Sequence, residues 1–199
     1  MKPRPVRPFA IPVALLAATA AGAAANVVAA ETFRLEKTHV DLLFSINHAG
    51  FTQKHGSFRE LDAMLQYDAR NLGKSQITVT VKTDSLDTGD AARDRDVKGD
   101  KFLDTAKFPE MIFASTKVTP GPKQTLLVEG TLTLHGVTKP LTLHATLNKS
   151  APNPFDKRPT LGFSASGSLK RSDFGISTYA PLIGDEVNID IDAEFNQKT

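Results

Sequence analysis

The sequence predicts an all-β protein: an antiparallel up-and-down barrel of about eight strands with one short helical excursion. Three observations support this fold class. Apolar and polar residues alternate with a period of two in successive runs, which places each set on one face of a strand. The connections are mostly short and rich in turn-forming residues, and only one stretch has helical features. Closure into a barrel buries the apolar faces in one interior and removes exposed edges.

Residues 1–30 have the features of a signal peptide. Three basic side chains start the segment, at Lys2, Arg4 and Arg7. The apolar run over 9–21 is too short to span a bilayer comfortably, and the small residues at 28–30 suit cleavage at their end. We therefore expect a single domain over 31–199, in the periplasm or secreted. A cut after the alanines at 23–25 and an N-terminal anchor helix are the alternatives.

The charge of the predicted domain excludes one class of partner. The chain has 24 Lys and Arg against 22 Asp and Glu, but three of the basic residues fall in the predicted leader. The domain therefore carries 21 against 22, a net charge of −1, with no basic run, and we expect no nucleic-acid partner. Cysteine is absent, so the domain has neither disulfides nor the lipidated cysteine of a lipoprotein.

Three strands are expected before the helix, over 33–48, 57–67 and 76–82. A polar turn is expected over 50–56, between the first two. Near Phe58 the alternation shifts by one residue, which predicts a β-bulge.

The strand pattern stops over 84–107. Asp90 is a suitable N-cap for a short helix over 91–100, whose charged side chains would face solvent. Phe102 and Leu103 follow the helix and would hold it against the barrel.

Five more strands are expected, over 111–118, 126–134, 141–147, 161–170 and 187–195. The second and third of these form the clearest hairpin, with Gly136 in its turn and Pro140 beside it. The loops at 149–159 and 171–185 are the longest connections in this half of the chain.

The inward faces of these strands consist of Val, Leu, Ile and Ala with a few Phe, while Gly130 and Gly167 fill no space. The interior is therefore either a packed core or the lining of a ligand cavity, and composition leaves both open. A transmembrane barrel also alternates, with its apolar side outward. The charged excursion over 90–107 and the scarcity of Tyr and Trp disfavour it.

Short motifs in a fixed order resemble one known family. They are His39, FSINH at 44–48, GSF at 56–58, DTG at 87–89, RD at 93–94, FLD at 102–104, FP at 108–109, FAS at 113–115, GTLTLHGVTKP at 130–140 and RSDFG at 171–175. Each motif alone is weak, but the ordered series over nearly all of 31–195 is similar to the YceI-like family. These are exported bacterial proteins, also called polyisoprenoid-binding proteins. The HGVTKP stretch at 135–140 is the strongest piece.

The resemblance implies an extended, lipocalin-like barrel whose apolar interior holds a long isoprenoid or another amphiphilic lipid. The inward side chains are then expected to bind that ligand: Val40, Leu42, Phe44, Ile46, His48, Phe58, Leu65, Tyr67, Ile77, Val79, Val81, Leu132, Leu134, Leu141, Leu143, Phe163, Ile189 and Ile191. No other cofactor is implied. After Arg93 and Asp94 the family usually has a His-Leu pair and a small polar residue, where this chain has Asp96-Val97 and Gly99.

No catalytic constellation and no close metal-ligand spacing occur in the sequence, and we expect no enzyme activity. His135 and His144 lie in the hairpin, where two metal ligands across the strands are conceivable. Their alternation phase places them on the outer face, which favours solvated surface histidines.

Three further polar residues are candidates for contact with a ligand head group. His48 continues the inward phase of the first strand, and either hydrogen-bonds a quinone carbonyl or a phosphate or is a buried histidine satisfied by backbone. Arg93 and Arg171 either meet an anionic head group or, as we favour, pair with acidic side chains such as Asp173.

The favoured function is a soluble exported carrier or store for isoprenoid quinones or polyprenyl lipids. The alternative is a non-binding structural or stress-associated exported barrel with a filled core, and a small isomerase comes third. Besides the lipid, a transient contact with a membrane or membrane protein and a homodimer remain open.

Overall fold

The computed structural model describes residue 1 and residues 30–198, and the predicted signal peptide lies outside the described residues except at its two ends. The strands are β1 (Glu31–His48), β2 (Thr52–Phe58), β3 (Leu61–Tyr67), β4 (Gln76–Lys82), β5 (Leu86–Asp87), β6 (Glu110–Pro120), β7 (Thr125–Leu134), β8 (Val137–Pro152), β9 (Pro159–Lys170) and β10 (Ile183–Gln197). The helices are α1 (Ala91–Lys98) and four 3-10 turns, at Leu72–Lys74, Thr83–Ser85, Pro122–Gln124 and Arg171–Phe174.

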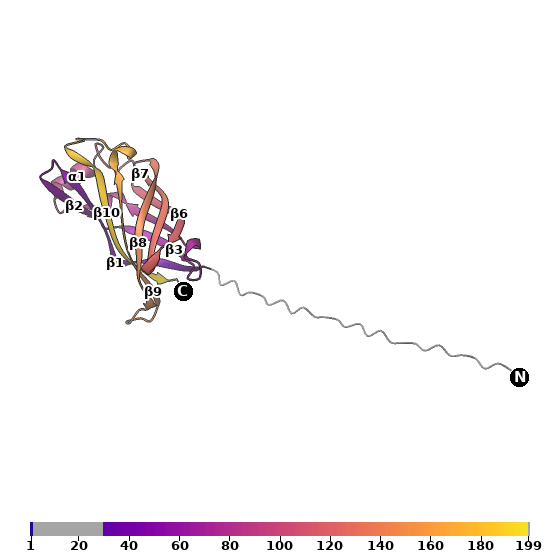
Figure 1. The fold of residues 1–199 in the computed structure, drawn as a ribbon. Helices are drawn as coiled ribbons and strands as arrows, with labels where there is room; N and C mark the ends of the chain where they lie inside the picture. The colour runs from indigo at the N-terminus through magenta and orange to yellow at the C-terminus, as the bar shows by residue number, and fades with distance from the viewer. Residues whose placement is uncertain (2–29, 199) are drawn as a thin grey trace.

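Eight of the strands form a closed antiparallel barrel, which confirms the predicted fold class (Figure 1). The order around the barrel is β1-β3-β4-β6-β7-β8-β9-β10, and β10 closes it by pairing with β1. Apart from β2 and β5, strands adjacent in the barrel are also consecutive along the chain, so the topology is up-and-down. Closure satisfies the backbone of both outermost barrel strands without any disulfide.

The long strand β1 belongs to two pairings on the same edge. Its start, Glu31 to Arg34, pairs with β3, and its end, Leu43 to His48, pairs with β2. The polar turn predicted over 50–56 is therefore wrong, because most of that segment is β2. The predicted bulge near Phe58 is wrong as well, since the shift in phase marks the end of β2 and the start of β3.

The predicted helix is present as α1, two residues shorter than expected. Asp90 is its N-cap, and its carboxylate accepts the backbone N–H groups of Ala92 at 2.9 Å and Arg93 at 3.0 Å. Leu103 is buried just after the helix, as expected. Among the described residues, no helix is long and apolar enough to cross a membrane.

The inward side chains pack most tightly where the start of β1 meets the end of β10. Phe33 and Leu161 are each 2% exposed there, and Phe195 is 4% exposed. Edge-to-face ring pairs, Phe33 with Tyr67 and Phe163 with Phe195, stabilise this end. We call it the packed end, and the larger part of the empty space in the barrel lies towards the opposite end.

Candidate functional site

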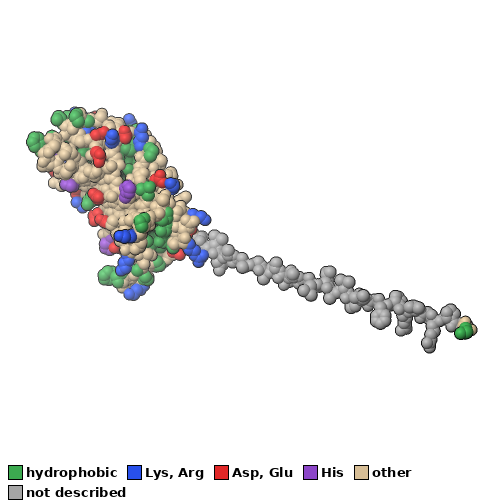
Figure 2. Space-filling view, in the orientation of Figure 1, with side chains coloured by type: hydrophobic (Ala, Val, Ile, Leu, Met, Phe, Trp, Pro, Cys, Tyr) green, Lys and Arg blue, Asp and Glu red, His purple; other side chains and the backbone are tan. Residues whose placement is uncertain are grey.

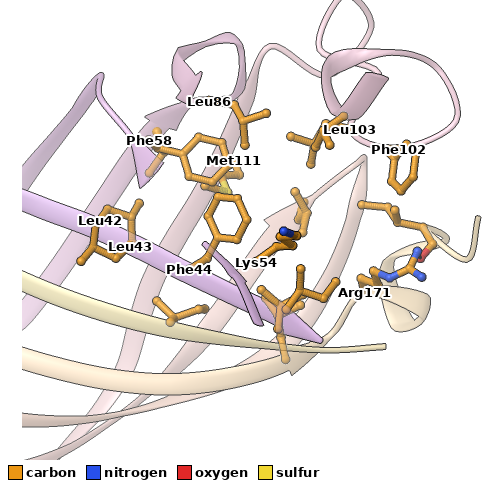
Figure 3. Close-up of a pocket in the computed structure, with 18 of the residues that line it drawn as sticks. Leu42, Leu43, Phe44, Lys54, Phe58, Leu86, Phe102, Leu103, Met111 and Arg171 are labelled. Atoms are coloured by element: carbon orange, nitrogen blue, oxygen red, sulfur yellow. The ribbon is translucent and has the colours of Figure 1, made fainter. Parts of the chain in front are cut away.

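A cavity of about 690 Å³ lies in the barrel at the end next to α1. Strand side chains form its wall, and most residues of the segment 93–103, in and after α1, also line it. Figure 3 shows Phe44 and Phe58 side by side in this wall, with ring centroids 5.8 Å apart. Most of the predicted ligand-binding residues line this main cavity: Leu42, Phe44, Ile46, His48, Phe58, Val79, Val81, Leu132, Leu134, Leu141, Leu143, Ile189 and Ile191.

A second cavity of about 130 Å³ continues towards the packed end. The remaining predicted residues line it: Val40, Leu65, Tyr67, Ile77 and Phe163. Five side chains line both cavities and surround the passage between them: Leu42, Val79, Phe113, Leu143 and Ile191. The two spaces therefore lie in line along the barrel and are bounded mainly by aliphatic and aromatic carbon.

Glycines opposite two aromatic rings set the position of those rings in the wall. A Cβ built on Gly130 would lie 2.6 Å from the Phe113 ring and 2.5 Å from the Ala114 carbonyl oxygen. A Cβ on Gly56 would collide with the ring of Phe44, its cross-strand partner. Gly130, one of the two glycines that fill no space in the pattern, thus makes room for a lining side chain, and so does Gly56.

The solvent end of the main cavity, which we call the mouth, is charged. Lys54, Arg93, Arg95 and Lys101 line it, together with Asp96 and Asp100. His48 also lines the mouth and is exposed, so it is not a buried histidine satisfied by backbone. Cations outnumber carboxylates here, whereas the whole domain is close to neutral.

Several residues that line the main cavity are not among those predicted from the sequence. The alternation does not identify Phe113, because Ile112 and Phe113 are both large and the phase of β6 is ambiguous; Phe113 is 6% exposed and Ile112 is 39% exposed. Leu169 and Val187 share the inward phase of their strands and also line the cavity. Lys54 lies in the segment predicted as a turn, and the residues after α1 carry no strand periodicity.

Arg171 is buried at this end of the barrel with 4% exposure. Its guanidinium donates to three backbone carbonyls: Nε to Gly184 at 2.8 Å, Nη1 to Ile176 at 2.9 Å and Nη2 to Ile183 at 2.8 Å. The predicted ion pair with Asp173 is therefore wrong. Burial lowers the pKa of Arg171, and the charge of Asp185 acts in the opposite direction.

Arg93 does pair with a nearby carboxylate, as expected. Its Nη2 lies 3.7 Å from Oδ2 of Asp90, and its Nη1 donates to the Thr88 carbonyl at 3.3 Å. Since the side chain is still partly exposed and lines the mouth, it remains accessible to a ligand.

The two hairpin histidines lie far apart, His135 in the turn between β7 and β8 and His144 within β8, and cannot share a metal. His135 follows Leu134, the partner of Val137, whereas His144 pairs with Leu127 near the other end of β7. His135 is half-buried, with Nδ1 3.1 Å from the Phe174 carbonyl and its ring 4.5 Å from that of Phe108, so its assignment as a solvated histidine is wrong. His144 is exposed, as expected. No cluster of three or more potential metal ligands occurs within 30–198.

Comparison with known sequences identifies the family. The sequence model of the YceI-like domain matches residues 33–195, which covers nearly the whole barrel. The chain belongs to the YceI-like family. A UPF0312 protein of Pseudomonas savastanoi pv. phaseolicola is 38% identical to this YceI-like chain over 190 residues, covering 96% of the chain and 95% of the relative.

Solved structures share the fold of the YceI-like chain. BcnA of Burkholderia cenocepacia superposes with a TM-score of 0.73 at 21% identity, over 80% of this chain and 98% of BcnA. A polyisoprenoid binding domain from Saccharophagus degradans, implicated in plant cell wall breakdown, superposes with a TM-score of 0.60 at 16% identity, over 85% and 99% of the two chains.

The departure of this YceI-like chain from the usual family pattern lies in the cavity wall. Asp96, Val97 and Gly99, which follow the Arg93-Asp94 motif, all line the main cavity. At this part of the mouth the chain presents the carboxylate of Asp96.

Proposed function

We propose that this protein binds a long isoprenoid, of the quinone or polyprenyl type, or another amphiphilic lipid in its barrel, as an exported carrier or store. The single observation that carries the proposal is the pair of in-line cavities, apolar along their length and charged only at the mouth. An amphiphile with a long tail has the same distribution of polarity. The binding activity named for the Saccharophagus degradans domain, which has the same fold, supports the proposal.

The charges at the mouth favour a polar or anionic head group. Lys54, Arg93 and Lys101 carry N–H donors for carbonyl or phosphate oxygens, and His48 adds one more polar group at the same place. The tail would then supply most of the affinity, at about 0.8 kcal/mol per buried CH₂ before the cost of ordering.

The competing function, a structural barrel with a filled core, is the less favoured. A filled interior leaves no space for a ligand, whereas the main cavity of about 690 Å³ lies within the range of small-molecule sites. Location in the periplasm or outside the cell is part of the proposal, supported by the leader-like sequence of residues 1–30.

Native mass spectrometry after incubation with an isoprenoid quinone tests the proposal. We expect a complex with one added lipid mass for the unmodified protein. Val79→Phe narrows the passage and should weaken the complex, while Thr78→Phe, one residue along and exposed on the outside, is the matched control and should retain it. A bare polypeptide mass for the unmodified protein would favour the filled barrel.

A further inference from the structure

Large hydrophobic side chains stand exposed around the outside of the mouth. Phe51 is 86% exposed, Leu182 68% and Tyr179 60%, and we call these three residues the mouth rim. Figure 2 shows hydrophobic side chains gathered at the end of the molecule where β2 and α1 lie in Figure 1. Exposed apolar groups of this size that cluster in one place usually mark a contact surface.

Backbone and side-chain contacts hold the mouth rim together. The Ala49 N–H donates to the Leu182 carbonyl at 2.7 Å, which joins the turn after β1 to the loop before β10. The Tyr179 ring lies 6.2 Å from the Phe102 ring, so the same loop also contacts the segment after α1. These contacts hold the segments that carry the mouth rim next to one another, although they come from separate parts of the chain.

The mouth rim is continuous with the main cavity. Tyr179 itself lines the cavity, and Phe51 lies between the lining residues His48 and Lys54. Leu182 precedes Ile183, which is also a lining residue. A hydrophobic molecule that leaves the cavity at this end therefore meets the rim before it meets bulk water.

Charges beside the mouth rim favour an anionic partner. Lys54, Arg95 and Lys101 line the mouth, and Asp96 and Asp100 oppose them only in part. Basic side chains next to exposed aromatic and aliphatic groups are the combination that binds anionic lipid surfaces, because the apolar groups enter the interface while the cations meet the head groups.

We propose that the mouth rim docks on the surface of an anionic lipid bilayer, with Phe51 and Leu182 entering the interface. Docking places the mouth against the bilayer, so that a water-insoluble ligand passes between bilayer and cavity without crossing water. The role in ligand transfer rests on the proposed lipid-binding function, whereas docking itself rests only on the rim and its charges.

An exposed phenylalanine at the opposite end of the barrel, Phe155, is a control for the specificity of the mouth rim. Phe155, in the loop between β8 and β9, is 93% exposed and stands near Lys157, but it lines neither cavity. If any exposed phenylalanine beside a cation were sufficient, Phe155 would contribute as much as the rim.

Flotation with vesicles tests the docking surface. The full chain, Phe51→Asp/Leu182→Asp and Phe155→Asp are each mixed with vesicles of phosphatidylcholine containing about a third phosphatidylglycerol, or none. We expect partitioning of the unmodified protein on the anionic vesicles that weakens with salt. The partition coefficient of the rim double variant on anionic vesicles should be lower by about tenfold or more, whereas that of Phe155→Asp should change little. Equal partitioning of the rim variant and the unmodified protein, or no partitioning of the unmodified protein, would overturn the proposal, and the latter result would point to a protein partner.

Calorimetry with a detergent-solubilised isoprenoid separates docking from ligand binding. Neither Phe51 nor Leu182 lines a cavity, so the rim double variant should bind the isoprenoid as the unmodified protein does. If the rim variant loses this binding and its native circular dichroism as well, the rim is structural and the docking proposal is contradicted. If the unmodified protein partitions through its rim but binds no isoprenoid, docking stands and the lipid-binding function fails.

Discussion

At the scale of single residues, Arg171 organises the mouth end of the barrel. Its three carbonyl partners belong to the loop after the Arg171–Phe174 turn and to the start of β10, so one side chain fixes the path of both segments. A planar guanidinium offers its N–H groups in a fan that an ammonium group lacks. The buried cation thus stabilises the frame that carries Tyr179 and Leu182.

Replacement of Arg171 should destabilise the fold in a graded way. Arg171→Ala leaves one buried and two partly buried carbonyls without their donor and should lower the free energy of unfolding by about 3 kcal/mol. Arg171→Lys keeps the charge but cannot reach all three carbonyls, so its free energy of unfolding should lie between those of the unmodified protein and Arg171→Ala. Urea unfolding measures both. A change below about 0.5 kcal/mol for both variants would contradict the assigned role.

Gly56 should be coupled energetically to Phe44. Gly56→Ala forces its Cβ into the Phe44 ring and should cost about 1–3 kcal/mol. Phe44→Leu removes the colliding ring atoms, so the double variant should be less destabilised than the sum of the two single variants by about 1 kcal/mol. A double-mutant cycle by urea unfolding measures the coupling. If the losses of the two single variants simply add, the Phe44 ring moves away from the new Cβ at no cost.

The sequence predicted apolar residues of the site better than polar ones. Period-two alternation determines which strand side chains face inward, and every residue selected on that basis lines one of the two cavities. The partners of Arg171 and His135 are backbone carbonyls in segments without periodicity. Since any residue supplies a carbonyl, nothing in the sequence identifies such a partner.

At the scale of elements, β2 shows where periodicity stops being informative. The strand TQKHGSF lies between β1 and the two-residue edge strand β5, and none of its residues is buried, so neither face is fully covered. Alternation arises when one face is buried and the other is solvated. Without that contrast, the polar run over 50–56 resembled a turn. The helix α1 was predictable because its N-cap is a local signal.

The Arg171–Phe174 turn should contribute an acid-sensitive contact with β10. Ser172 donates its backbone N–H and its hydroxyl to the Asp185 carboxylate, at 2.9 and 2.7 Å, and these hydrogen bonds lower the pKa of Asp185. A carboxyl whose folded-state pKa is lowered stabilises the fold above its unfolded value of about 4, and this contribution is lost as the pH falls through the folded-state pKa.

The variant Asp185→Asn isolates this contact. It should be less stable than the unmodified protein at neutral pH. The difference should shrink as the pH falls below about 4, where the unfolded carboxyl takes up a proton, and through the lower pKa of the folded state. Urea unfolding at neutral and acid pH gives the two differences. A difference in unfolding free energy that stays constant with pH would contradict this. It would show that the hydrogen bonds from Ser172 do not need the Asp185 carboxyl to be charged.

At the scale of the whole molecule, the barrel combines one packed end with one hollow end. The ring pairs Phe33–Tyr67 and Phe163–Phe195 lie at one end, beside the narrow second cavity, while the main cavity opens at the other end between α1 and the turn after β1. A ten-residue strand tilted by about 40° spans ~25 Å along the barrel axis, which limits the straight length of a bound tail. The passage around Phe113 divides that length into a wide part and a narrow part.

Calorimetric titration with a series of isoprenoids that share one head group tests the lipid-binding account most directly. If the tail lies along the two cavities, affinity should climb steeply with tail length and level off once the second cavity is full. Val79→Phe should bring the plateau to shorter tails, because it narrows the passage. An affinity that is flat against tail length but changes strongly with the head group would contradict the account and place the ligand at the mouth, around His48.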